Sequence, residues 1–180
     1  MIAPPKPAVS CPYGREKKAY DYLVAKGVSA FYPTIQVMKE IRGQRKVVTE
    51  SRLPNIFFAF GTEEEIKSYV YDNVNLPYLR FYYRHMHEGA RITKSPLIVP
   101  QKQIEGLKII CESEADDILY VPEEVQKFKE GQMVRVIDGK FKGLTGRVAR
   151  YQGQQRVAII VDGGFTMATA YLPTAFLEYI

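Results

Sequence analysis

The last fifty residues of the chain are divided by glycines and turn pairs into short segments. These segments are rich in β-branched and aromatic residues, which favours strands over helices. The turn pairs, such as Asp138-Gly139, supply the positive φ angles that tight hairpins need. Short strands at this spacing predict a small β-barrel. The expected strands cover residues 133–137, 146–150, 157–161, 168–172 and 176–179.

Charge divides the chain into three blocks. Residues 1–112 carry 17 basic and 11 acidic side chains, residues 113–130 carry 2 and 6, and residues 131–180 carry 6 and 3, for a net charge of +5. An acidic block between two basic ones indicates a boundary. We therefore expect an N-terminal domain over 1–112, an acidic linker over 113–128 and a barrel domain over 129–180. Basic excess attracts polyanions such as nucleic acid, although it is also common on solvated surfaces.

The composition is that of a folded soluble protein, with 180 residues of which 46% are hydrophobic. No apolar run approaches the roughly 20 residues that cross a bilayer, and prolines interrupt the first seven residues, which argues against a secretion signal. Cys11 and Cys111 lie a hundred residues apart, which suggests neither a disulfide framework nor a zinc motif. We expect a cytoplasmic monomer with no membrane partner.

The N-terminal block alternates helical and strand patterns. Prolines and glycines separate the segments, and Thr62 with Glu65 forms the pattern of a helix-opening capping box. Strands and helices alternate without strict βαβ regularity, which favours an α+β sandwich. The expected helices are 15–26, 62–72 and one that begins at Pro100, and the expected strands are 30–38, 46–52, 56–60 and 78–83, with a basic hairpin tip at 42–44.

The residues offer little for catalysis. His85 and His87 lie two apart, on the same side of a strand and within reach of one metal ion, but no neighbouring carboxylate or cysteine completes a ligand set. Phosphate-binding, serine-nucleophile and zinc-protease motifs are missing from the sequence. We expect a non-enzyme without a cofactor. A metal-dependent nuclease that uses the two histidines is a distant alternative.

The run from Gly131 to Val148, which reads GQMVRVIDGKFKGLTGRV, resembles the KOW motif. This motif is the strand-loop-strand opening of an SH3-like barrel in NusG-type transcription factors and some ribosomal proteins. The resemblance implies that the loop carrying Phe141, Lys142 and Gly143 contacts a partner, either NusE, which is also a ribosomal protein, or the termination factor Rho. We expect Phe141 to be exposed, the alternative being that it plugs the barrel end.

Upstream segments are similar to the N-terminal domain of NusG, in the order of that family. They are Tyr32-Pro33-Thr34, Glu40-Ile41-Arg42-Gly43 and Leu53-Pro54-Asn55-Ile56-Phe57-Phe58. The two resemblances together cover about residues 14–180. Details in Tyr13-Gly14-Arg15-Glu16-Lys17-Lys18 and Phe141-Lys142-Gly143 look most like UpxY, the specialised paralogues of capsular polysaccharide operons. The fold implied is α+β, with a NusG-like α/β sandwich followed by the KOW barrel, which we expect not to refold into helices.

The resemblance implies a transcription elongation and antitermination factor that rides on RNA polymerase. The family binds polymerase through a hydrophobic patch, with a further contact at the start of a helix; the matching residues are Tyr22, Leu53, Ile56, Phe58, Lys67 and Ser68, and a core role is the alternative for the first four. In the paralogue RfaH, basic residues read the non-template DNA strand. The nucleic-acid-binding residues expected here are Tyr13, Arg15, Lys17, Lys18, Arg42 and Arg45.

The start of the chain departs from the family, which opens with a Trp-Tyr strand inside the sheet. This chain has no Trp, and its first seven residues include three prolines, which cannot donate to a sheet ladder. We therefore expect residues 1–7 to stay outside the sheet centre and only 8–11 to pair. The alternative function is an RNA-binding ribosomal or translation accessory protein that acts through the KOW barrel.

Overall fold

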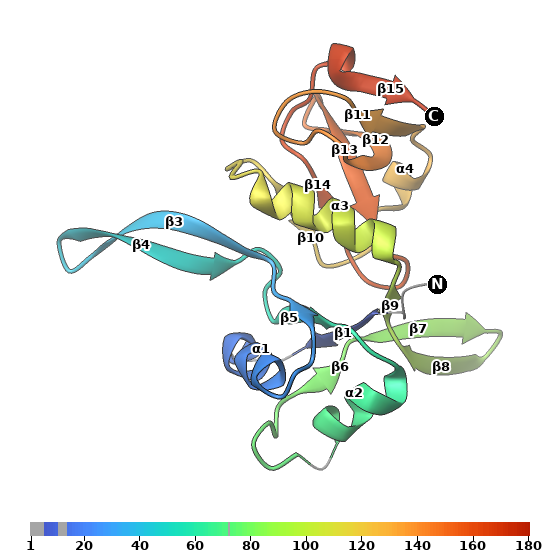
Figure 1. Ribbon diagram of the computed structural model, residues 1–180. Helices are drawn as coiled ribbons and strands as arrows, with labels where there is room; N and C mark the ends of the chain where they lie inside the picture. Colours follow the sequence, from blue (N-terminus) through green and yellow to red (C-terminus); the bar gives the residue numbers. More distant parts are fainter. Residues whose placement is uncertain (1–5, 11–13, 72) are drawn as a thin grey trace.

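The computed structural model describes residues 6–10, 14–71 and 73–180. Its N-terminal antiparallel sheet and its C-terminal barrel lie on opposite sides of helix α3 (Gln101–Glu112), as Figure 1 shows. The α+β fold predicted from the sequence is confirmed.

The N-terminal sheet has the strand order β2-β5-β1-β6, and β9 pairs with one end of β1. Every pairing within it is antiparallel. The strands are β1 (Lys6–Ser10), β2 (Ala30–Phe31), β5 (Ile56–Ala59), β6 (Arg80–Phe81) and β9 (Ile98–Val99). The expected strand at 56–60 therefore lies near the centre of the sheet.

Strand β1 begins earlier than expected. The prediction that only residues 8–11 pair is wrong, because Lys6 and Pro7 pair with Val99 and Ile98 of β9. The pairing of β1 with β5 begins only at Ala8, so Pro7 has a neighbouring strand, β9, on one side. A proline is tolerated there because its missing N–H deprives at most one neighbour of a hydrogen bond.

Helices α1 (Glu16–Ala25) and α2 (Glu63–Val70) pack on one face of this sheet. Their ends follow the sequence signals. Gly27 has a φ of 85°, which suits the residue after a helix. Thr62 and Glu65 form both hydrogen bonds of the capping box. The alternation along β5 directs Phe57 toward these two helices and Phe58 toward α3 on the opposite face.

Two hairpins project from the body of the molecule in opposite directions, as Figure 1 shows. The first joins β3 (Thr34–Ile41) to β4 (Gln44–Ser51), and the second joins β7 (Tyr83–Glu88) to β8 (Arg91–Pro96). Arg42 and Gly43, with φ angles of 52° and 76°, form the two-residue turn at the tip of the first. The expected strand at 30–38 is divided into β2 and β3.

The C-terminal sheet is a barrel of six strands in the order β10-β14-β13-β12-β11-β15. All five expected strands overlap strands of the structure, but the one expected at 168–172 shares only Ala168 with β14, which ends there. The remaining elements are β10 (Leu119–Val121), α4 (Gln126–Lys129), β11 (Met133–Val136), β12 (Thr145–Tyr151), β13 (Gln154–Ile160), β14 (Thr166–Ala168), the 3-10 turn Thr174–Phe176 and β15 (Leu177–Tyr179).

The segment expected to be an acidic linker, 113–128, is attached to the barrel. Its strand β10 pairs with β14 along Leu119–Val121. Asp117 lies just before that strand and accepts two hydrogen bonds from the buried Arg156, one through its carbonyl oxygen at 2.8 Å and one through its carboxylate at 2.7 Å. The acidic residues of this segment therefore include a partner for a buried cation.

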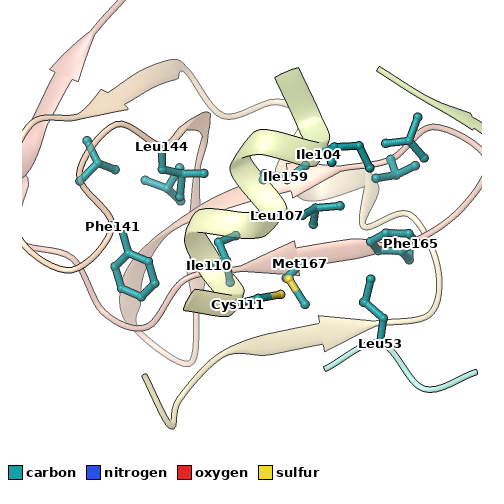
Figure 2. Packing of buried hydrophobic residues seen from close by; sticks show 14 of the residues in the cluster. Leu53, Ile104, Leu107, Ile110, Cys111, Phe141, Leu144, Ile159, Phe165 and Met167 are labelled. Atoms are coloured by element: carbon teal, nitrogen blue, oxygen red, sulfur yellow. The ribbon is translucent and has the colours of Figure 1, made fainter. Parts of the chain in front are cut away.

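One hydrophobic core joins the two halves of the molecule. Ile104, Leu107 and Ile110 of α3 belong to one cluster of buried residues with side chains of the N-terminal half and of the barrel. Figure 2 shows these α3 side chains near Phe165 and Met167 of the barrel, with Leu53 of the N-terminal half in the same core. Phe58 of β5 also approaches Phe165 of the barrel, with ring centroids 6.3 Å apart. The barrel therefore packs against the N-terminal half through one shared core.

Candidate nucleic-acid and partner interfaces

A cavity of about 320 Å³ opens beside the first turn of α1. Arg15 and Lys18 line it from the helix, and the loop between α2 and β6 supplies the opposite wall. The Arg15 guanidinium carbon lies 4.0 Å from the ring centroid of Tyr78, a stacked cation–π arrangement. The cavity thus joins two cations to an aromatic plane. Its loop wall is formed by Val74, Asn75, Leu76, Pro77 and Tyr78.

Local backbone geometry holds these two walls in place. Gly14 has a φ of 66°, and its N–H donates to the Asn55 side-chain oxygen at 3.5 Å, which ties the start of α1 to the turn before β5. On the other wall, the side-chain amide of Asn75 donates a hydrogen bond to the Tyr22 hydroxyl at 3.4 Å. The loop that carries Tyr78 is therefore bonded to the same helix that carries Arg15.

Sequence reasoning identified Arg15 and Lys18 but missed Tyr78 and Asn75. Arg15 and Tyr78 belong to elements far apart in the chain, and no spacing rule connects them. The available signal was compositional: Asn73, Asn75 and Pro77 mark a polar turn-rich loop beside an aromatic residue, a composition common at binding loops.

The other predicted nucleic-acid residues are placed differently. Lys17 is exposed but lies 2.7 Å from a carboxylate oxygen of Asp21, one turn along α1. Arg42 and Arg45 are exposed at the tip of the β3–β4 hairpin, and Arg45 pairs across the strands with Glu40. Tyr13 lies outside the described residues. The structure thus separates the expected set into a cavity and a hairpin tip.

A buried polar pair lies under the first turn of α1. Glu16 is buried, and it accepts a hydrogen bond from the Tyr32 hydroxyl at 3.4 Å. Burial, and next the neighbouring Glu16 charge, raise the pKa of Tyr32. A carboxylate in the first turn also interacts favourably with the helix dipole. This pair anchors the helix start from which Arg15 and Lys18 extend.

The residues matched to the polymerase-binding patch are not an exposed surface in this structure. Leu53, Ile56 and Phe58 are 0%, 3% and 0% exposed, in the core shared with α3 and the barrel. Tyr22 packs with the cluster on the other face of the sheet, beside Phe57. The expectation of one exposed patch that includes all four is therefore wrong here, because Leu53, Ile56 and Phe58 are covered in the core shared with α3 and the barrel, and Tyr22 packs with the cluster on the other face of the sheet.

Lys67 and Ser68 are exposed on α2, but in the last turn rather than at the helix start where they were expected. Lys67 lies 2.8 Å from Glu63, and this hydrogen-bonded ion pair raises the pKa of Lys67. The Ser68 hydroxyl donates to the Glu65 carbonyl at 2.8 Å. Both side chains are engaged within their own helix.

The KOW loop presents its polar residues and conceals its aromatic one. Phe141 is 3% exposed and belongs to the core that the barrel shares with α3, so the expectation of an exposed ring is wrong and its burial agrees with the alternative of a ring that plugs the barrel end. Lys142 and Gly143 are exposed, and Gly143 has a φ of 91° that turns the chain back toward β12. Figure 2 shows Phe141 in the same core view as Ile110 of α3.

The two predicted histidines lie on β7, where both are exposed. Among residues 6–10, 14–71 and 73–180, no cluster of three or more His, Cys, Asp or Glu side chains has a metal-binding arrangement. None of the described helices combines the length and apolar character needed to span a bilayer.

Comparisons with known proteins identify the C-terminal part of the chain. Residues 130–163 match the family model for the KOW motif, so the barrel is a KOW-containing domain. A solved structure described as "Domain interaction in Thermotoga maritima NusG" is similar to the whole chain. The alignment covers 98% of this chain and 97% of that one, with 19% sequence identity and a TM-score of 0.45.

Proposed function

We propose that this protein is a NusG-type transcription elongation and antitermination factor. The observation that carries the proposal is a KOW barrel joined to an α/β sandwich whose first helix opens on a basic, aromatic-walled cavity. In this proposal the N-terminal half, residues 1–112, binds RNA polymerase. The barrel, residues 129–180, binds NusE or Rho through Lys142 and Gly143. The UpxY-like segments support a role in a polysaccharide operon.

The cavity beside α1 is the proposed contact with the non-template DNA strand. Single strands are bound by cations that meet phosphates and by planar groups that stack on bases. Arg15 and Lys18 supply the cations, and Tyr78 supplies the plane. Arg42 and Arg45 at the hairpin tip add further positive charge at a second point of the same half.

Binding of polymerase through Leu53, Ile56 and Phe58 requires the barrel to move, because these side chains are covered. Gly106 of α3 offers a way to test this. A Cβ at Gly106 would lie 2.6 Å from Cδ1 of Ile159 on β13, so a larger side chain there wedges α3 from the barrel. Gly106→Leu should therefore favour the open arrangement.

The experiment measures retention of purified RNA polymerase on the immobilised full chain. We expect Gly106→Leu to retain more polymerase than the wild type. Gln101→Leu adds the same side chain at an exposed position of α3 and should retain the wild-type amount. Small-angle scattering verifies that only Gly106→Leu expands the molecule. An expanded variant with unchanged retention would refute the buried patch as the polymerase site.

Transcription through a terminator in vitro tests the activity itself. We expect longer transcripts with the wild-type protein, and loss of the effect when Arg15 and Lys18 are both changed to Gln. Lys17→Gln with Asp21→Asn is the matched control, because it removes a neighbouring ion pair on the same helix. Equal read-through with and without the wild-type protein would reject antitermination.

The exposed lysines of the KOW loop support one other function, binding of ribosomal RNA by a translation accessory protein. Lys140 and Lys142 both face solvent beside the buried Phe141. Copurification from cells separates the two functions. Polymerase subunits in the purified material support the transcription factor, whereas ribosomal particles without polymerase support the accessory protein.

A further inference from the structure

We propose that one face of the β7–β8 hairpin is a second nucleic-acid surface, which binds single-stranded RNA. The cross-strand register places His85 opposite Lys94 and His87 opposite Ile92, so these side chains share one face of the ribbon with Tyr83. We call this surface the ribbon face. It comprises Tyr83, His85, His87, Ile92 and Lys94, together with Tyr71 at its base.

The ribbon face is the open side of the hairpin. His85, His87 and Lys94 are exposed, and Ile92 is 59% exposed. The other face carries half-buried side chains at Met86, Thr93 and Ser95. Its Arg84 packs directly against Gly163 in a barrel turn. The hairpin therefore turns its second face toward the barrel and leaves the ribbon face available to a partner.

Aromatic groups begin this face where the hairpin leaves the sheet. Tyr71, which is 47% exposed, and Tyr83 share a hydrogen bond of 2.6 Å between their hydroxyl oxygens. This hydrogen bond, together with burial, raises the pKa of Tyr83 to about 12. His85 and His87 follow at about 7 Å spacing along the strand. Planar groups thus continue from the body of the protein toward the hairpin tip.

The charges on the ribbon face match a nucleic acid. Lys94 is its cation, and no residue of the hairpin contributes a carboxylate to it, because Glu88 lies on the other face opposite Arg91. The charge of Glu63 acts on Tyr83 at its base, but Glu63 is already ion-paired with Lys67 at 2.8 Å. One full positive charge is too few to hold a duplex by phosphates alone, whereas planar side chains stack readily on unpaired bases.

One property favours RNA over DNA as the occupant. Stacking on the Tyr and His side chains of this face suits the unpaired bases of either single strand. The imidazoles also present ring nitrogens that can donate to or accept from a 2′-hydroxyl, a group that DNA lacks. Figure 1 places this hairpin on the side of the molecule opposite α1 and the β3–β4 hairpin, so the surface is separate from the proposed DNA contact.

The test measures fluorescence anisotropy of labelled twelve-nucleotide rU and dT probes with the full chain. An Arg15→Gln/Lys18→Gln background weakens the cavity site, and polymerase is omitted, so the result is independent of the proposed transcription function. We expect rU to bind more tightly than dT. Changing both histidines to Ala should weaken rU binding at least about fivefold, the lower range for loss of one stacked base.

A matched pair of charge variants separates a specific face from general attraction. Lys94→Gln and Arg91→Gln each remove one cation from the same hairpin, on opposite faces. Lys94→Gln should weaken rU binding and lower the salt dependence by about 0.7 in the log–log slope, and Arg91→Gln should change affinity less than about twofold. Equal losses in both variants, absence of rU binding, or tighter binding of dT would each overturn the proposal.

Discussion

Cys111 lies on α3 at the centre of the shared core and is 4% exposed. Burial raises the pKa of its thiol to about 12, so almost none of the reactive thiolate is present at neutral pH. We expect a Cys11→Ser variant to react with iodoacetamide only after unfolding in urea. Labelling followed by mass spectrometry measures this. Rapid labelling of the folded chain would show that α3 is exposed to solvent.

Glu124 is a second residue whose pKa is shifted by its environment. It accepts a hydrogen bond from the Gly163 N–H and lies 2.6 Å from Lys129. Burial opposes ionisation of Glu124, but these two partners outweigh it and lower its pKa. A lowered pKa in the folded state means that the carboxylate stabilises the fold above its unfolded pKa, and that this contribution is lost as the pH falls through the folded value.

The Glu124→Gln variant tests this predicted dependence of stability on pH. We expect it to be less stable than the wild type near pH 7, and the difference in urea midpoint to shrink toward zero near pH 3. Urea denaturation followed by circular dichroism at several pH values gives the comparison. Glu123→Gln removes a neighbouring exposed carboxylate and is the control. A difference that grows in acid would contradict the assignment.

At the scale of elements, α2 depends on its capping box. The Thr62 hydroxyl accepts from the Glu65 N–H at 3.2 Å, and the Thr62 N–H donates back to the Glu65 carboxylate at 2.7 Å. We expect Thr62→Ala to destabilise the protein by about 1 kcal/mol, because the Glu65 N–H loses the hydroxyl that accepts its hydrogen bond. Thermal or urea denaturation measures the change. Ser68→Ala removes an exposed serine hydroxyl from the last turns of α2 and should cost less than about 0.5 kcal/mol.

At the scale of the whole molecule, the shared core should make unfolding cooperative. Leu107 of α3 is fully buried between the N-terminal sheet and the barrel. We expect one calorimetric transition for the wild type, and a loss of about 3 kcal/mol for Leu107→Ala that affects both halves together. Calorimetry gives the number of transitions, and unfolding curves recorded separately from tyrosine and amide signals show whether both halves are affected together. Two transitions in the wild type would show that the halves unfold independently.

The sequence predicted most of the local structure because local rules control it. The capping pair at Thr62, the glycine after α1 and the turn pairs of the barrel act within four residues of the chain. The Arg42-Gly43 tip also lies where expected. Errors occurred where a distant partner decided the outcome. Pro7 joins the sheet because β9 pairs with it, and Leu119–Val121 becomes a strand because β14 accepts it.

The candidate sites divide in the same way. The sequence by itself determined the KOW segment, the basic start of α1 and the strand at 56–60, because composition and short spacing contain this information. Only the tertiary structure decided that Tyr78 meets Arg15, that α3 and the barrel cover Leu53, and that the two histidines share an open face with Lys94. The physical reason is that burial and contact between distant segments depend on how whole elements pack, and no local pattern specifies that packing.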